Sequence, residues 1–298
     1  MSAALAIVGP TASGKSAFAL ELARLRGDVE LVSADAMQVY RGMDIGTAKP
    51  SVAERAEVAH HLVDVADPGE DFSLARFVAL GRAAIADIEA RGRRAIVVGG
   101  TGLYVRGLVD ELEVPGQWPD VRAELEAERD TPALHQRLAA LDPVAASRME
   151  PTNRRRVVRA LEVSIGAGRP FSSFGPGLDA HPPVATEQIG LRVPLDVLDA
   201  RIEQRVHAML DAGLLDEVRG LLDRGIVLSR TARQALGYRE LLEHLEGAMS
   251  YDEAVSVVTQ RTRQFARRQV RWFRRDPRIR WVDGCLPPSE LARSAFVQ

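Results

Sequence analysis

The sequence predicts an α/β fold, in which a parallel sheet flanked by helices is interrupted by an inserted helical domain. Short apolar runs alternate with helical periodicity over the first part of the chain, which is typical of such a sheet. Glycine-rich or polar turns follow several of these runs directly. A block without strand patterns then precedes a later strand at 188–193. We therefore expect a core made of residues 1–117 and 187–298, with residues 118–186 as the insertion.

The first strand and helix enclose the most informative motif of the chain. Residues 5–8 are an apolar run, and residues 17–25 place apolar side chains at helical spacing. Between them, residues 9–16 read GPTASGKS, which satisfies the phosphate-loop pattern G-x-x-x-x-G-K-[ST]. In such a loop, backbone N–H groups and the helix N-terminus hold an anion. The core is therefore expected to be of the P-loop type and to bind a di- or triphosphate.

Individual residues of this loop have separate expected roles. The residues expected to bind the phosphates are Gly9, Thr11, Ala12, Ser13, Gly14, Lys15 and Ser16. Lys15 supplies a mobile positive charge, and the Ser16 hydroxyl can bind Mg²⁺. Among 39 basic residues only Lys15 and Lys49 are lysines, so a chain that otherwise uses arginine keeps lysine in its phosphate loop. Lys49 either marks residues 44–50 as a second functional segment or is a chance exception to the arginine bias.

Two turns in the first half of the chain are expected to meet the phosphate loop. The next predicted elements are strands at residues 29–32, 61–65 and 95–98 and a helix at 74–90. Asp35 comes just after the second strand, and Thr101 lies between glycines just after the fourth. Because ligands of open parallel sheets bind beyond the carboxyl ends of the strands, both residues should line one crevice with the loop. Asp35 would be a catalytic base there, or else an ordinary turn residue.

From Pro115 onward, helix signals replace strand signals. Trp118 and Pro119 open a helix with proline at its first position. The predicted helices of this block are residues 121–129, 131–141 and 153–166. The last of them carries four arginines in six residues, Arg154, Arg155, Arg156 and Arg159. This run indicates either phosphodiester contacts or a solvated helix face.

The last third of the chain is rich in arginine. A predicted helix at 198–211 contains Arg205, and residues 234–239 form a compact polar and aromatic element. Residues 260–275 then hold seven arginines and no acid. Because no carboxylates are interspersed, we expect a surface for a polyanion rather than a network of surface ion pairs, with a solvated face as the alternative.

Composition limits the remaining possibilities. The single cysteine, Cys285, excludes an internal disulfide framework and suits a reducing compartment. No apolar stretch is long enough to span a membrane, and a strand at the very start leaves no room for a signal peptide. We therefore expect a cytoplasmic protein, and nothing in the sequence demands more than a monomer. The net charge of −2 means that any nucleic-acid binding depends on local basic patches.

Seven blocks together identify a family resemblance. They are GPTASGKS at 9–16, SADAMQVYRGMDIGTAKP at 33–50, GGTGLY at 99–104, RRRVVRALEV at 154–163, RIEQRV at 201–206, QALGYRE at 234–240 and TRQFARRQVRWFRR at 262–275. In these blocks and their order, the chain resembles the bacterial tRNA dimethylallyltransferases. Departures are slight, because Ala36, Phe265 and Arg267 stand where the family often has serine, tyrosine and lysine.

The resemblance implies transfer of a dimethylallyl group from dimethylallyl diphosphate to N6 of the adenosine 3′ of a tRNA anticodon. The phosphate loop would then hold the donor's diphosphate, with Mg²⁺ on Ser16. Asp35 would take a proton from the amine and Thr101 would hold the adenine, while Lys15 and Arg205 would neutralise the diphosphate. The expected tRNA contacts, those of the arginine-rich run included, are Asp35, Ala36, Met37, Gln38, Thr101, Arg122, Arg155, Arg156, Arg159, Arg233, Gln234, Gly237, Tyr238, Arg239, Arg263 and Arg267.

One alternative from another class stays open. A small-molecule kinase would also need a phosphate loop, and its arginine-bearing insertion would close as a lid over ATP. The apolar run at 95–98 does not end in the aspartate that NTP hydrolases use for Mg²⁺, so a group transfer is favoured over a motor or a switch.

Overall fold

The computed structural model describes residues 5–296 and divides the chain into two compact units. One unit contains the residues up to Asp110 together with those from Pro183 onward, and the other is Glu111–Pro182. These boundaries lie a few residues before those expected at 118 and 186. The first unit is called the core below, and the second the inserted unit.

A parallel six-stranded sheet organises the core. Its strands are β1 (Leu5–Val8), β2 (Val29–Ser33), β3 (His60–His61), β4 (Arg94–Gly99), β5 (Glu187–Arg192) and β6 (Ile279–Asp283), in the spatial order β3-β2-β4-β1-β5-β6. The central strand β1 pairs with β4 and β5, so that Val8 lies opposite Gly99 and Gly190. The phosphate loop after β1 and the turn after β4 therefore leave the sheet at the same end.

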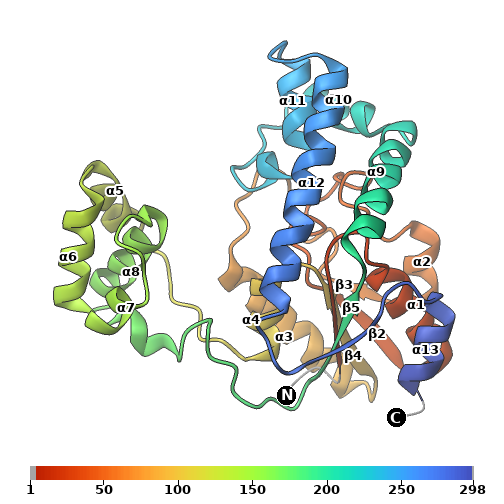
Figure 1. Cartoon of the computed structure of the whole chain (residues 1–298), viewed down its shortest axis with the longest axis horizontal. Coiled ribbons are helices and arrows are strands. Elements are labelled where there is room, and N and C mark those ends of the chain that lie inside the picture. Colours follow the sequence, from red (N-terminus) through yellow and green to blue (C-terminus); the bar gives the residue numbers. More distant parts are fainter. Residues whose placement is uncertain (1–4, 297–298) are drawn as a thin grey trace. The chain divides into compact units, whose positions relative to one another are not determined.

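Helices cover both faces of this sheet (Figure 1). Helices α1 (Lys15–Arg26) and α13 (Pro288–Phe296) pack on one face, in an apolar cluster that includes Ile7, Ile96 and Leu291. Helices α3 (Leu74–Ala90) and α4 (Gly102–Val109) pack against β4 from the other side. The α/β class predicted from the sequence is confirmed.

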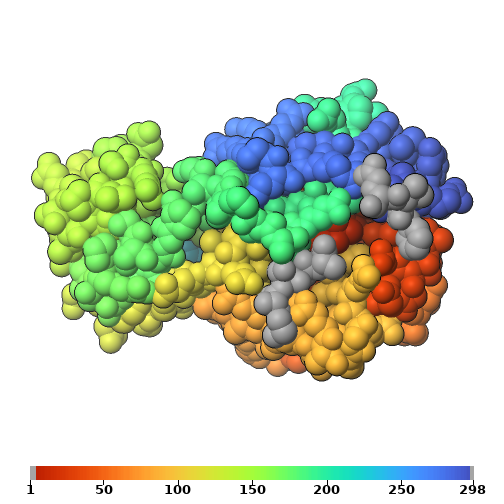
Figure 2. Space-filling view, turned by 90° about the horizontal axis from the view of Figure 1, so that it is seen from below, coloured from red at the N-terminus to blue at the C-terminus, as the bar shows by residue number. Residues whose placement is uncertain are grey.

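A helical layer stands beyond the carboxyl ends of the strands. Its helices are α9 (Leu195–Asp211), α10 (Leu214–Asp223), α11 (Tyr238–Leu245) and α12 (Tyr251–Phe273). Helix α12 runs alongside α9 (Figure 1), where Val258 and Ala266 pack on Leu198 and Ile202. Shorter helical pieces of the core are α2 (Val52–Glu57) and η2 (Ala232–Gln234). Figure 2 shows red N-terminal segments lying against blue C-terminal segments on the surface of the core.

The inserted unit is a small helical bundle. It contains α5 (Pro119–Ala127), α6 (Thr131–Leu141), α7 (Pro143–Ser147), α8 (Arg154–Gly166) and the short η1 (Phe171–Phe174). Pro119 is the first residue of α5, as its position in the sequence predicts. Leu125, Leu138 and Leu161 belong to its own apolar core. Within residues 5–296, no helix is both long and apolar enough to cross a membrane.

Several predicted elements need correction. The strand predicted at 61–65 has the wrong bounds, because β3 covers only His60–His61 and is followed by left-handed backbone at Leu62 and Asp64, with φ of 62° and 58°. Helix α12 begins at Tyr251, well before the arginine-rich run that suggested it. Helix α4, strand β6 and helix α13 lie where the sequence analysis expected no element.

Candidate active site at the phosphate loop

Small residues allow the phosphate loop to close tightly between β1 and α1. Ala12 and Gly14 have left-handed backbone, with φ of 61° and 92°. A Cβ on Gly9 would lie 2.9 Å from Ser13 Oγ, so a larger residue would collide with the loop. The Ser13 hydroxyl is buried and has no hydrogen-bond partner among the described residues. This hydroxyl and the free N–H groups of the first turn of α1 suit an anion such as diphosphate.

Three charges gather around this loop. Burial lowers the pKa of Lys15 to about 8, while the Asp35 carboxylate opposes this lowering and the Arg205 guanidinium adds to it. Burial also lowers the pKa of Arg205, again against the effect of Asp35. These mutual effects mean that the three side chains lie within electrostatic range of one another. The structure thus brings together two cations and a carboxylate that are far apart in the sequence.

Helices α9 and α12 hold the loop in place. Arg205 of α9 donates a hydrogen bond to the Thr11 hydroxyl. On α12, Gln269 Oε1 accepts the Thr11 N–H at 2.8 Å, and Gln269 Nε2 donates to the Gly100 carbonyl at 2.9 Å. Gln269 therefore joins the phosphate loop to the turn after β4. Sequence reasoning missed it. Its spacing of seven residues from Thr262 places both polar side chains on one face of a helix, and the structure buries that face.

The turns after β2 and β4 meet beside the loop. A Cβ on Gly99 would lie 2.2 Å from the Ala34 carbonyl oxygen, so glycine is needed for this approach. Thr101 Oγ1 accepts the Ala36 N–H at 3.2 Å. Asp35 Oδ1 accepts the N–H groups of Met37 at 2.8 Å and Gln38 at 3.4 Å. Its second carboxylate oxygen makes no hydrogen bond among the described residues, and so it is free to accept a proton.

The motif at 233–239 divides between surface and interior. Arg233, Gln234 and Arg239 are exposed, whereas Gly237 and Tyr238 are buried. The Tyr238 side chain is 0% exposed, and its hydroxyl donates a hydrogen bond to Glu217. A side chain without exposed surface has no atoms that an RNA could contact in this structure. We therefore assign Tyr238 a structural role, in place of the tRNA contact expected from the sequence.

Three of the arginines of α12 form ion pairs, contrary to the expectation drawn from the lack of acids around them. Their partners come from other helices: Arg261 pairs with Glu240 at 2.5 Å, Arg263 with Glu203 at 2.7 Å and Arg267 with Asp199 at 2.6 Å. Two of these carboxylates belong to α9, so the pairs join α12 to its neighbour. To contact tRNA as expected from the sequence, Arg263 and Arg267 would have to leave their carboxylate partners and pair with RNA phosphates instead.

The arginines of α8 also fall into two groups. Arg155 and Arg156 are exposed and have no ion-pair or hydrogen-bond partner for their side chains among the described residues. Arg159 pairs with Glu162 at 2.9 Å, and Arg122 of α5 pairs with the same carboxylate at 3.2 Å. Glu162 is 1% exposed, so both arginines compensate a buried charge.

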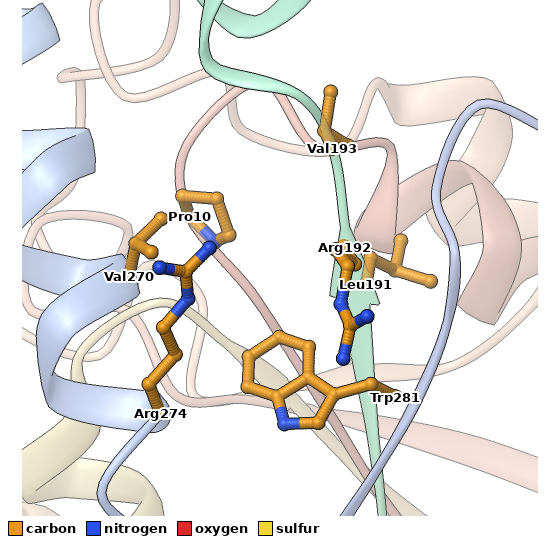
Figure 3. Close-up of a pocket in the computed structure, with 7 residues that line it drawn as sticks. All are labelled: Pro10, Leu191, Arg192, Val193, Val270, Arg274 and Trp281. Atoms are coloured by element: carbon orange, nitrogen blue, oxygen red, sulfur yellow. The ribbon is translucent and has the colours of Figure 1, made fainter.

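A pocket of about 450 Å³ opens beside the phosphate loop (Figure 3). It is lined by Pro10, Leu191, Arg192, Val193, Val270, Arg274 and Trp281. Figure 3 shows the guanidinium group of Arg274 beside Pro10 and Val270, and Arg192 and Trp281 line the same pocket. Lys15, Asp35 and Thr101 do not line this pocket. It is therefore distinct from the cluster of charged groups described above.

Comparison with known sequences gives a consistent result. The family model described as IPP transferase matches residues 38–276, and a second one, described as isopentenyl transferase, matches residues 2–64. A tRNA dimethylallyltransferase of Geobacter metallireducens is 50% identical over 285 residues, which cover 93% of this chain and 91% of that protein. The enzyme of the same name from Kineococcus radiotolerans is 51% identical over 300 residues, covering 97% and 94%.

Solved structures agree with the sequences. The tRNA isopentenylpyrophosphate transferase of Bacillus halodurans is 40% identical, with a TM-score of 0.71 over 98% of this chain and 94% of that one. A eukaryotic dimethylallyltransferase acting on tRNA is 27% identical, with a TM-score of 0.81 over 95% of this chain and 74% of that one. Because the family model spans most of the chain and close relatives cover almost all of it, the chain belongs to the IPP transferase family.

Proposed function

We propose that this protein is a tRNA dimethylallyltransferase, which transfers a dimethylallyl group from dimethylallyl diphosphate to N6 of the adenosine 3′ of the anticodon. The observation that carries the proposal is the grouping of Lys15, Arg205 and Asp35 around a phosphate loop. Two cations suit a diphosphate leaving group, and a carboxylate with one free oxygen suits a base. The relatives are named as enzymes that act on tRNA, which supports tRNA as the acceptor.

The reaction balances with these groups alone. The N6 amine attacks the first carbon of the allyl group, the bond from that carbon to the diphosphate oxygen breaks, and diphosphate departs with the electron pair. Because an allylic carbon develops cation character, stabilising the departing anion lowers the barrier most. Lys15 and Arg205 do this, and Asp35 accepts the proton lost by the amine. The adenine must leave its stack to reach the crevice, which costs least in a single-stranded loop.

Mg²⁺ fits this site as part of the same proposal. The Ser16 hydroxyl lies in the first turn of α1, is exposed and makes no hydrogen bond among the described residues. Residues 5–296 contain no cluster of three or more His, Cys, Asp or Glu side chains that could hold a metal. Ser16 would hold the ion through its hydroxyl oxygen, and oxygen is the ligand atom that Mg²⁺ prefers. When bound, the ion supplies positive charge to the diphosphate.

Donor choice tests the proposed function directly. The protein is mixed with an unmodified anticodon stem-loop and either dimethylallyl diphosphate or ATP, and the RNA is then weighed. We expect one dimethylallyl group to replace one hydrogen, with dimethylallyl diphosphate only. A stem-loop with guanosine in place of the adenosine 3′ of the anticodon serves as the control. ATP consumption without a change in RNA mass would support a kinase instead.

The pKa of Lys15 predicts how catalysis depends on pH. With a pKa of about 8, Lys15 is mostly charged below pH 8 and loses its charge above it. Since kcat/KM reports ionisations of the free enzyme, its value for the donor should fall by about tenfold per pH unit above pH 8. In Lys15→Arg the guanidinium keeps its proton, so the fall should disappear. A wild-type profile without this fall would contradict the assignment of Lys15 to donor binding.

Arg155 and Arg156 are predicted to bind RNA phosphates, because both are exposed and unpaired and belong to the block at 154–163 that resembles enzymes acting on tRNA. Replacing both with alanine should weaken stem-loop binding and reduce the slope of log Kd against log salt by about one unit for each phosphate that is no longer bound. Arg137→Ala, an exposed arginine of α6 in the same unit, is the control and should change neither quantity. An unchanged slope in the double variant would remove α8 from the RNA-binding surface.

A further inference from the structure

The segment that follows the candidate base is held by groups from far along the chain. Residues 43–49 lead away from the Asp35 turn and contain no helix or strand. Lys49 anchors one end, because its buried ammonium donates to the Tyr40 carbonyl at 2.7 Å and to Asp64 at 2.6 Å. The lysine that stood out in the sequence therefore has a structural task. The other end of the segment depends on a residue that the sequence analysis did not single out.

That residue is Glu217 of α10. Its Oε2 accepts the backbone N–H groups of Asp44 at 2.8 Å and Ile45 at 2.9 Å, and its Oε1 accepts that of Gly46 at 3.3 Å. Consecutive N–H groups converging on a carboxylate form a concave anion site within the protein itself. Hydrogen bonds to an ionised acceptor are stronger than neutral ones, so Glu217 holds residues 44–46 firmly.

Tyr238 holds Glu217 from behind. Its buried hydroxyl donates to Glu217 Oε1, and a Cβ on Gly46 would lie 2.4 Å from the Tyr238 ring, so ring and loop are in close contact. Burial, together with the Glu217 carboxylate, raises the pKa of Tyr238, which keeps the hydroxyl protonated as a donor. The tyrosine of the family motif is thus used to orient a carboxylate.

Gln38 connects this arrangement to the candidate base. Its Nε2 donates to the carbonyls of Thr47 at 3.2 Å and Ala48 at 3.1 Å, and its Oε1 accepts the Ser33 hydroxyl at 2.8 Å. The backbone N–H of the same Gln38 points at Asp35 Oδ1. A continuous path of hydrogen bonds and short chain segments therefore runs from Glu217, through residues 44–48 and Gln38, to Asp35.

We propose that Glu217, oriented by Tyr238, is a positioning residue that fixes the carboxylate of Asp35 for proton transfer. The inference rests on the proposed function, because it assigns Asp35 the role of base. Misplacement of a reacting group by about 1 Å costs on the order of a hundredfold in rate. Loosening residues 44–48 should therefore appear in kcat, whereas binding of the donor at the phosphate loop should be unaffected.

The test is Glu217→Gln, which keeps the shape of the side chain but replaces one acceptor oxygen with a donor. We expect kcat for stem-loop modification to fall by about tenfold to a hundredfold, with the KM for dimethylallyl diphosphate unchanged. Hydrogen exchange followed by mass spectrometry should show faster exchange in residues 35–48. Asp216→Asn, at the neighbouring exposed carboxylate that pairs with Arg219, is the matched control and should leave both measurements unchanged.

A double-mutant cycle separates positioning from simple stabilisation. If Glu217 acts through Gln38, the effect of Glu217→Gln on kcat should shrink in a Gln38→Ala background, whereas independent effects add. Tyr238→Phe removes one donor from Glu217 and should lower kcat several-fold in the same way, even if Glu217→Gln fails to fold. A lower melting temperature with kcat intact, or a rise in donor KM alone, would overturn the inference. If the wild-type protein modifies no RNA, it is the proposed function that fails.

Discussion

Replacing Lys15 with alanine is expected to lower kcat by about 10²–10³, the usual loss when one preorganised electrostatic group is removed from an active site. The diphosphate gains charge as it departs, and Lys15 lies in a loop where burial already lowers its pKa to about 8. In such a partly dehydrated site an ammonium attracts an anion more strongly than it would in water. The bound donor should raise the pKa of Lys15 again, because a diphosphate favours the charged form.

The measurement for Lys15→Ala is single-turnover transfer at saturating donor, so that weak binding does not mask the chemical step. Lys15→Arg is the matched variant, because it keeps the charge and should retain more activity than alanine. A melting curve for each variant shows whether the loop still folds. Near-normal turnover of Lys15→Ala at saturating donor would exclude a role for this lysine in leaving-group stabilisation.

Replacing Asp35 with asparagine should lower kcat by about 10²–10⁴, the usual contribution of a general base. The structure makes this substitution informative, because the amide oxygen of asparagine can still accept the N–H groups of Met37 and Gln38. The turn should therefore keep its shape, while the oxygen that would take the proton is replaced by an amide nitrogen. Loss of rate then reports chemistry and not folding.

A control and an opposing outcome accompany the Asp35 variant. Asp71→Asn changes an exposed carboxylate elsewhere in the core and should leave kcat unchanged. Donor KM should be compared well below pH 8, because loss of the Asp35 carboxylate lowers the pKa of Lys15 further and Lys15 must stay charged in both proteins. A folded Asp35→Asn protein within a few-fold of the wild-type rate would mean that the proton leaves by another route. Asp35 would then only stabilise the turn that follows β2.

Local signals predicted much of the core. The apolar runs at 5–8 and 95–98 became β1 and β4 because buried parallel strands need short continuous apolar segments. The helix at 74–90 matches α3, whose Ser73 cap and apolar stripe are readable in the sequence. Strand β6 was missed because it has only five residues, which do not alternate strictly between apolar and polar, and because it lies soon after a run of arginines. Such an edge strand carries a weak signal.

The sequence by itself determined the phosphate loop and the position of Asp35 just after a strand, because both depend on residues that are neighbours along the chain. Only the tertiary structure decided which arginines are paired and which polar groups support the site. The carboxylates that face Arg263 and Arg267 come from α9, and Gln269 reaches the phosphate loop from α12. Glu217 and Tyr238 contact residues 44–46 because the last third of the chain packs beyond the sheet. Contacts of this kind join segments that are far apart in the sequence, so no local sequence pattern predicts them.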